Sequence, residues 1–270
     1  MKTHKELIYD INSLPLEGLL SFWWLGQLGY VLKLGGKIIY IDAYLVNSPG
    51  RAVPTLLHDF EVTNADIVIG THDHSDHIDR ANWPEVAKAS PKAAFVVPNP
   101  LRKSISSELG ILENRVYRLR DMETITFADI RITGIAAAHE FLDRDEQTGE
   151  YMYTGCVISY KDINIYHSGD CCIYEGLISR LQSFGHIDLM LIPINGRDGQ
   201  RYRRGCIGNM TYQEAADLAG AIKPRLVCPS HYDLIYGNTE DVGKFLDYMN
   251  AKYPEIKSWT GEYGERVSVL

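Results

Sequence analysis

A short run of metal-binding residue types is the most informative feature of this chain. Residues 72–77 read His-Asp-His-Ser-Asp-His, so three of the nine histidines in 270 residues fall within six positions. Imidazole nitrogens and carboxylate oxygens bind divalent ions such as zinc. His72 and His74 would point the same way in extended backbone, whereas Asp76 and His77 follow them and could face a second ion. The run therefore predicts two adjacent metal positions on one loop; the alternative is a solvated polar loop with a chance cluster.

This run directly follows a predicted buried strand. Residues 65–70 (Ala-Asp-Ile-Val-Ile-Gly) form a short apolar segment, typical of a strand buried on both faces. Three further candidate ligands also end apolar runs, namely His139 after residues 132–138, Asp170 after 165–169 and His231 after 225–230. Loops at strand ends often carry function because the strands position them. Taken singly, the two histidines could be structural and the aspartate an ordinary turn residue.

The elements that must position these residues are mostly strands. We expect strands at residues 22–25, 30–34, 37–41, 65–70, 94–97, 115–119, 123–127, 130–137, 155–160, 164–166, 188–193 and 225–228, with a Gly-Gly hairpin turn at 35–36. Helices are expected in the first twenty residues, before a loop ending near Pro15, and at 100–109 (ending at Gly110), 211–222 (with a Thr211/Glu214 capping box) and 239–251. Helices fall between groups of strands, which predicts an α/β fold in which helices cover sheets. No repeat or linker is visible, so we expect one domain over residues 1–270.

Composition limits the classes of protein to which this chain could belong. Apolar residues make up 45%, which is ordinary for a globular chain. The net charge of −8 makes nucleic acid an unlikely partner. Four arginines nevertheless crowd one segment, at 197, 201, 203 and 204. No signal peptide or membrane span is apparent, so a cytoplasmic location with no membrane partner is expected. The five cysteines lack metal-site or disulfide spacing and are interpreted as free thiols.

Residues 71–79 (Thr-His-Asp-His-Ser-Asp-His-Ile-Asp) resemble the signature of the metallo-β-lactamase superfamily. The resemblance extends from about Trp23 to His231 and implies an αββα four-layer sandwich. It also implies two metal ions, the first held by His72, His74 and His139, the second by Asp76, His77 and His231, with Asp170 bridging both. Such a pair lowers the pKa of a shared water and provides a hydroxide nucleophile at neutral pH. Asp76 would act as a catalytic residue by orienting that hydroxide or moving its proton.

A narrower resemblance concerns the L-ascorbate-6-phosphate lactonase branch. It is carried by residues 23–26 (Trp-Trp-Leu-Gly), 166–170 (Tyr-His-Ser-Gly-Asp), 209–211 (Asn-Met-Thr) and 229–233 (Pro-Ser-His-Tyr-Asp). Members of that branch open a sugar-acid lactone and depend on manganese. The present chain is shorter and has His139 where the lactonase lacks a histidine.

Several other residues are candidates for supporting roles. Asn195, Arg197 and Tyr232 are predicted to contact substrate, with Arg197 or Arg204 as the partner of an anionic group; a solvated basic loop is the alternative. Asp42 could hold the metal loop through hydrogen bonds, or be a turn residue. His167 could support Asp170, or be a buried structural histidine. Trp23, Trp24, Cys171 and Cys172 are interpreted as packing residues.

These residues together predict a metal-dependent hydrolase that uses a metal-bound hydroxide on a small anionic lactone, ester or amide, with two Zn²⁺ or Mn²⁺ ions as cofactors. Two alternatives remain open. The first is a metal-dependent phosphodiesterase or nuclease of the same fold, against which the acidic charge counts. The second is a metal-binding or redox module without hydrolytic turnover. The chain could also form a homo-oligomer.

Overall fold

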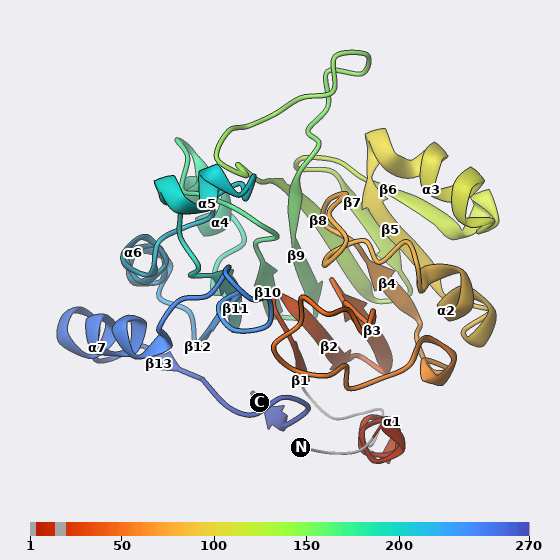
Figure 1. The fold of residues 1–270 in the computed structure, drawn as a ribbon, viewed down its shortest axis with the longest axis horizontal. Helices are drawn as coiled ribbons and strands as arrows, with labels where there is room; N and C mark the ends of the chain where they lie inside the picture. Colours follow the sequence, from red (N-terminus) through yellow and green to blue (C-terminus); the bar gives the residue numbers. More distant parts are fainter. Residues whose placement is uncertain (1–3, 14–19, 270) are drawn as a thin grey trace.

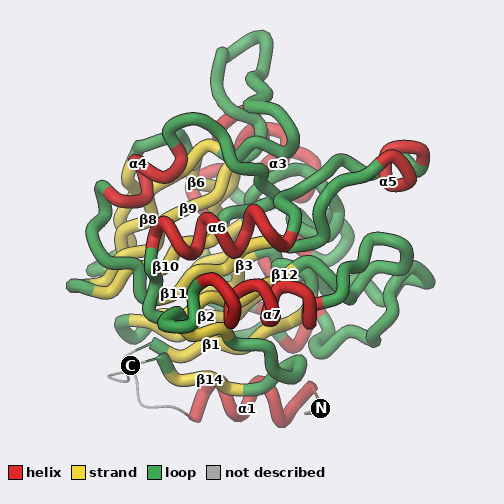
Figure 2. Tube along the Cα trace, turned by 90° about the vertical axis from the view of Figure 1, so that its left-hand side faces the viewer, coloured by secondary structure: helices red, strands yellow, loops and turns green. Residues whose placement is uncertain are grey.

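Two seven-stranded sheets pack face to face, and helices cover their outer faces, giving an αββα sandwich (Figures 1 and 2). The structure is a computed structural model that describes residues 4–13 and 20–269. The predicted α/β four-layer architecture is therefore confirmed. The predicted loop near Pro15 lies outside the described residues.

The first sheet has the strand order β14-β1-β2-β3-β4-β5-β6. Its strands are β1 (Ser21–Gly26), β2 (Gly29–Leu34), β3 (Lys37–Ile41), β4 (Ile67–Ile69), β5 (Ala94–Pro98), β6 (Val116–Leu119) and β14 (Arg266–Ser268). Strands β3 to β6 run parallel to one another, and the pairs at the β14 edge are antiparallel. The helices on this side are α1 (His4–Ser13), α2 (Trp83–Ala89) and α3 (Arg102–Leu109), with 3₁₀ turns η1 (Asp59–Glu61), η2 (Asn99–Leu101) and η3 (Glu113–Arg115).

The second sheet has the order β13-β12-β11-β10-β9-β8-β7 and the same mixed character. Its strands are β7 (Thr124–Phe127), β8 (Ile130–Ala136), β9 (Thr154–Tyr160), β10 (Ile163–His167), β11 (Leu189–Pro193), β12 (Leu226–Ser230) and β13 (Lys257–Ser258). Strands β10 to β13 are parallel, whereas β7 to β10 pair antiparallel. Helices α4 (Leu177–Gln182), α6 (Tyr212–Ile222) and α7 (Val242–Lys252) cover it, and α5 (Gly199–Arg203) projects on a long connection (Figure 2).

Side-chain alternation along the strands builds two apolar layers. In β1, Phe22 and Trp24 join the core between the sheets, whereas Trp23 and Leu25 pack on the helix side. Strand β3 divides in the same way, because successive side chains of a strand point to opposite faces. Both tryptophans are buried, so their interpretation as packing residues is confirmed. With both faces covered, the sheets place their strand ends rigidly.

Most predicted elements are present, with differences at short ones. Gly110 ends α3 in a left-handed conformation, and Thr211 and Glu214 form the predicted capping box of α6. The predicted start of the last helix at residue 239 was wrong, because the Asp241 side chain accepts from the Gly243 backbone N–H and α7 begins at Val242. Helices α2, α4 and α5 and strands β13 and β14 were not predicted, since each is too short for a clear periodic pattern. Across the described ranges, no helix has the length and apolar character of a membrane span.

Candidate metal centre

The structure brings all seven predicted ligand residues together at one end of the sandwich. They follow the carboxyl ends of four strands: the 72–77 loop follows β4, His139 follows β8, Asp170 follows β10 and His231 follows β12. They form two groups, His72/His74/His139/Asp170 and Asp76/His77/His231. Within each group, one potential ligand atom per residue lies within 4.8 Å of the others. Segments separated by up to 159 positions, from residue 72 to residue 231, thus meet in the division that the superfamily resemblance implies.

Asp170 lies between the two groups. Its Oδ2 is 3.5 Å from His139 Nε2 in the first group and 3.3 Å from His231 Nε2 in the second. Its Oδ1 is 3.4 Å from His77 Nε2. One carboxylate therefore faces ligand nitrogens of both groups, as a bridging ligand would.

Two atoms at the centre lack the hydrogen bonds that burial normally requires. His77 Nε2 and Asp170 Oδ1 are both buried, and neither has a hydrogen-bond partner within the described part of the chain. Buried polar atoms are almost always paired, and a metal ion is one partner that would satisfy both. The donor set of imidazole nitrogens and carboxylate oxygens also suits borderline divalent ions. The residues present thus fit a metal pair.

Asp42 fixes the loop that carries the histidines. Its Oδ2 accepts from His77 Nδ1 at 2.7 Å and from Thr71 Oγ1 at 2.7 Å, and its Oδ1 accepts from the Thr71 backbone N–H at 2.9 Å. This bond leaves His77 Nε2 facing the other candidate ligands, which is how carboxylates commonly orient metal-binding histidines. The prediction that Asp42 holds this loop is confirmed.

Two other histidines, His139 and His72, are oriented from their far sides as well. His139 Nδ1 donates to the Gly208 carbonyl at 2.9 Å, so its Nε2 faces Asp170. His72 Nδ1 is 3.1 Å from Thr71 Oγ1, and its Nε2 is 2.9 Å from His74 Nδ1. Each of these rings therefore directs one nitrogen into the site.

Two residues near the centre escaped the sequence analysis. Gln27, in the β1–β2 turn, donates from Nε2 to Asp76 Oδ2 at 3.1 Å, and its Oε1 is buried without a partner among the described residues. The ring of Tyr153 lies 5.3 Å from those of His72 and His139. Neither belongs to a motif. Turn geometry and strand pairing alone bring them here.

Backbone conformation is also unusual around the centre. Gln27, Asp42 and His231 have positive φ angles of 51°, 46° and 60°, a region that non-glycine residues rarely adopt. Such conformations persist where the surrounding contacts enforce them, and they concentrate at functional sites.

The electrostatics of the two groups differ. Burial lowers the pKa of His72 and His74, which keeps both rings neutral and able to donate a lone pair. Burial also opposes charge on His231, but Asp170 and Asp76 outweigh it and raise the pKa of His231 to about 9. Asp170, Asp42 and Asp76 likewise raise the pKa of His77 despite burial. The metal-free second group therefore holds protons that a cation would displace.

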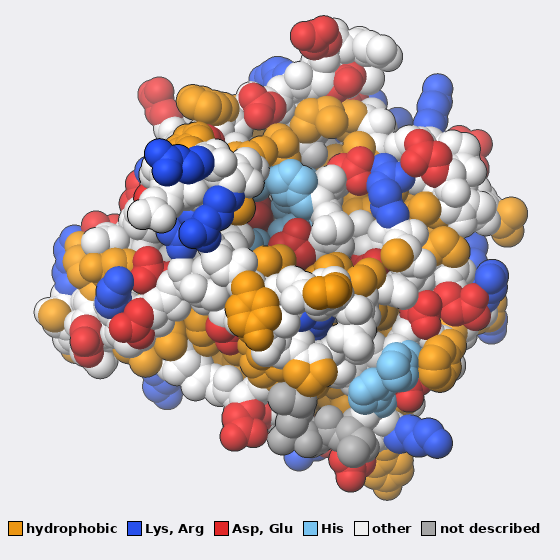
Figure 3. Space-filling model, viewed as in Figure 1, with side chains coloured by type: hydrophobic (Ala, Val, Ile, Leu, Met, Phe, Trp, Pro, Cys, Tyr) orange, Lys and Arg blue, Asp and Glu red, His pale blue; other side chains and the backbone are white. Residues whose placement is uncertain are grey.

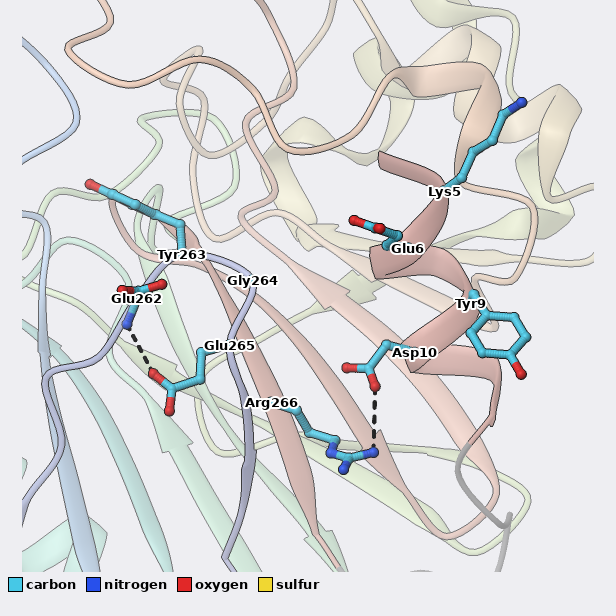
Figure 4. Close-up of a pocket in the computed structure, with 9 residues that line it drawn as sticks. All are labelled: Lys5, Glu6, Tyr9, Asp10, Glu262, Tyr263, Gly264, Glu265 and Arg266. Atoms are coloured by element: carbon cyan, nitrogen blue, oxygen red, sulfur yellow. Dashed lines mark hydrogen bonds and ion pairs between the residues drawn. The ribbon is translucent and has the colours of Figure 1, made fainter. Parts of the chain in front are cut away.

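The centre opens into a cavity of about 360 Å³. Its lining comprises His74, Asp76, His139, Asp170 and His231 from the centre, together with residues 204–207 and 235–238. Figure 3 shows a hollow with histidine and acidic side chains in it and Lys or Arg side chains along one edge. A larger hollow of about 880 Å³ lies between α1 and residues 262–266 (Figure 4), but no candidate ligand lines it. The chemistry-bearing residues thus make the smaller cavity the candidate functional site.

The three predicted substrate contacts lie away from the wall of that cavity. Both ends of the Arg197 guanidinium bind Glu214 at 2.7 Å. Asn195 is buried and donates to Asn238 Oδ1 at 2.9 Å, and Tyr232 packs against Trp24 with ring centroids 5.4 Å apart. Asn195 contacts the lining through Asn238, and Tyr232 directly follows His231 of the lining. Direct contact of these residues with substrate stays a prediction.

Other residues near Asp170 have structural roles. His167 is buried and donates from Nε2 to the Leu28 carbonyl at 2.8 Å, which favours the structural alternative for this residue. Cys171 and Cys172 are buried free thiols, and burial raises the pKa of Cys171 to about 12. Their interpretation as packing residues is confirmed.

The chain is similar in sequence and in fold to known metal-dependent hydrolases. The sequence model described as "Beta-lactamase superfamily domain" matches residues 21–231. A protein of Sulfurisphaera tokodaii named UPF0173 metal-dependent hydrolase is 30% identical over 236 residues, covering 85% of this chain and 92% of the relative. The structure of Igni18, described as a novel metallo hydrolase from Ignicoccus hospitalis, superposes with a TM-score of 0.71 at 19% identity, covering 92% and 97% of the two chains. A possible metal-dependent hydrolase from Veillonella parvula superposes with a TM-score of 0.72 at 15% identity, covering 93% and 100%.

Proposed function

The chain belongs to the metallo-β-lactamase superfamily and is a metal-dependent hydrolase, and on that premise we propose that it acts on small anionic lactones, esters or amides. One observation carries the proposal: seven ligand-type side chains converge on a buried centre in which one nitrogen and one oxygen lack a hydrogen-bond partner among the described residues. The motif resemblance to the ascorbate-6-phosphate lactonase branch supports a lactone among these substrate classes.

We propose that the centre holds two divalent ions, Zn²⁺ or Mn²⁺. His72, His74 and His139 would hold one ion, Asp76, His77 and His231 the other, and Asp170 both. When bound, such a pair supplies Lewis acidity toward a carbonyl oxygen and lowers the pKa of a water molecule.

The chain's own residues supply position and proton transfer. Asp76 lines the cavity and is half-buried, so its carboxylate reaches both the centre and a substrate. Gln27 Nε2 donates a hydrogen bond to one oxygen of Asp76. This bond orients the Asp76 carboxylate, and the carboxylate itself remains the proton-transferring group. A carboxylate so placed accepts a proton from an attacking water and returns it to the leaving alkoxide or amine. Asp42 and Gly208 keep His77 and His139 in fixed orientations during these steps.

Metal content tests the site directly. His72→Ala, Asp170→Ala and His231→Ala would be purified beside His186→Ala, a control at a half-exposed histidine outside the centre. Elemental analysis should show loss of metal in the three variants and retention in the control. Full retention of metal in all three would overturn the ligand assignment.

A substrate panel tests the reaction class. Wild-type protein should hydrolyse lactones or activated carboxylic esters faster than bis-4-nitrophenyl phosphate. Strong phosphodiester turnover with inert lactones and esters would instead establish the phosphodiesterase alternative. Bound iron with a visible absorption band and no turnover would establish the redox alternative.

A further inference from the structure

The wall of the catalytic cavity carries a positive charge that the metal centre does not use. Among the residues that line the cavity, Arg204 is the one Lys or Arg side chain. It is exposed, and its Nη1 makes a single long contact of 3.4 Å with the Gly237 carbonyl. The carboxylates of the centre do not pair with it. Its guanidinium therefore keeps most of its donors available.

A second hollow joins the cavity at this residue. It measures about 970 Å³, is lined partly by Arg201 and Arg203, and shares Arg204 and Gly237 with the catalytic cavity. Arg201 is engaged by Asp198 and by the Thr239 carbonyl. Arg203 is exposed at the end of α5. Figure 3 shows cationic side chains gathered beside the hollow that holds the histidines. Arg203 and Arg204 therefore place positive charge at this point of a chain whose net charge is −8, and such a charge attracts anions.

Apolar side chains also line this wall. Ile207 is 37% exposed and Tyr236 67% exposed, and Ile235 is half-buried beside them in the lining. Exposed apolar side chains beside a polar site are typical of ligand-binding cavities. The cavity therefore presents a cation and an apolar surface at a distance from the metal-binding floor.

Arg197 does not compete for this role. Both ends of its guanidinium bind Glu214, and it lies outside the lining of the cavity.

We propose that Arg204 binds the anionic group of the substrate, a carboxylate or a phosphate, while Ile207, Ile235 and Tyr236 contact an apolar portion between that group and the scissile bond. The proposed substrate is thus a small amphiphilic anion. This assignment of a substrate rests on the proposed hydrolase function, whereas the binding of an anion by Arg204 does not.

Cys206 provides a test that needs no turnover. It lines the same cavity two residues from Arg204, and the other four cysteines are buried. Metal-loaded protein would be alkylated with iodoacetate, an anion, and with iodoacetamide, its neutral analogue, at low ionic strength. The ratio of the two rate constants cancels any change in the Cys206 thiol itself and reports the local preference for an anion.

Arg204→Gln should lower the iodoacetate-to-iodoacetamide ratio roughly fivefold, because a nearby charge acts strongly at short range in low salt. Arg203→Gln removes the same charge from the adjoining hollow only, and should change the ratio less than about twofold. An unchanged ratio in Arg204→Gln, or an equal fall in both variants, would overturn the anion site.

Matched esters then test the link to catalysis. Mono-4-nitrophenyl glutarate carries a free carboxylate, and 4-nitrophenyl butyrate does not. Arg204→Gln should raise KM for the glutarate ester roughly tenfold, the size of one charge-assisted hydrogen bond, and leave kcat/KM for the butyrate ester within about twofold. Equal effects on both esters would overturn the substrate assignment. If wild-type protein cleaves neither ester, the ester arm of the proposed function fails, while the alkylation ratio still decides the anion site.

Discussion

Among the residues that the structure describes, two clusters combine histidines with a carboxylate, and their contrast shows what a metal centre needs beyond ligand types. Besides the centre around Asp170, His4 of α1 meets His58 and Glu61 near η1, again with ligand atoms within 4.8 Å of one another. At the surface cluster, Glu61 Oε2 already lies 3.0 Å from His4 Nδ1 and accepts from the His58 backbone N–H at 2.9 Å. His58 is exposed, and its ring stacks on Phe60.

The central cluster differs in burial and in unmet hydrogen-bonding capacity. His77 and Asp170 are buried, each with one atom that lacks a hydrogen-bond partner among the described residues. Asp42 and Gly208 orient the rings of His77 and His139 from outside. In the surface cluster, Glu61 already makes hydrogen bonds to His4 and to the His58 backbone, and His58 is exposed. Proximity alone is therefore weak grounds for a metal site, whereas an oriented, buried and unsatisfied set is strong grounds.

Removing the shared carboxylate should break the contrast most severely. Asp170→Ala removes the proposed shared ligand of both groups and leaves His77 and His231 facing one another without their common anion. We expect loss of both metals and a fall in hydrolytic rate of roughly a thousandfold or more, since the positioned nucleophile and the Lewis acid are lost together. Elemental analysis and steady-state kinetics measure these effects. An active variant with full metal content would show that Asp170 is not a shared ligand.

The unfolding free energy should depend on pH in the metal-free protein but not in the metal-loaded protein. The pKa of His231 is about 9 in the folded metal-free chain, because Asp170 and Asp76 outweigh burial, against about 6.5 for an unfolded histidine. A raised pKa stabilises the fold fully below pH 6.5, and this contribution is lost as the pH rises toward 9. The metal-free protein should therefore lose up to about 3 kcal/mol of unfolding free energy over that range.

Urea denaturation of chelator-treated protein between pH 6 and 9.5 measures this loss. Metal-loaded protein is the control, because bound cations replace the protons and should flatten the profile. A flat profile for the metal-free protein would show that His231 does not carry the extra proton.

Weakening the outer support should have a smaller effect. Asp42→Asn keeps the size of the side chain and tolerates the positive φ of this position, but removes the charge that accepts from His77 Nδ1. We expect a fall of about 10- to 100-fold in the affinity of the second metal position. Chelator competition measures it, with Asp66→Asn as the matched control at a carboxylate that binds Lys37 instead. Equal affinities in the two variants would contradict the supporting role of Asp42.

The same contrast explains what the sequence could predict. The 72–77 run is local, and His139, Asp170 and His231 each follow an apolar strand, so they could be recognised as candidate ligands. Their convergence was implied by the resemblance to the metallo-β-lactamase superfamily. The supporting role of Asp42 could also be predicted, because this residue directly follows β3. The layered α/β fold was predictable because long strands and the capped helix α6 have clear periodic patterns.

Contacts made across unrelated loops could not be predicted. Gln27 reaches Asp76 from a turn 49 positions away, and that contact depends on the backbone conformation of the turn. Arg197 and Arg204 look equivalent in the sequence, but Glu214 on α6 binds one and leaves the other at the cavity wall. His4 and His58 are 54 positions apart and only the docking of α1 brings them together. Such pairings depend on tertiary packing, for which a single sequence carries no local signal.

Changes at the surface cluster should have the smallest effect. Glu61→Gln removes the anion beside His4, and because the pair is partly exposed we expect a loss of at most about 1 kcal/mol in unfolding free energy. His4→Ala should behave alike, and both variants should retain the full metal content of the loaded protein. Denaturation midpoints and elemental analysis measure the two quantities. If Glu61→Gln instead lost one equivalent of metal, an exposed and hydrogen-bonded cluster would have proved able to hold an ion. Burial and unpaired atoms would then no longer distinguish the centre around Asp170 from the surface of the molecule.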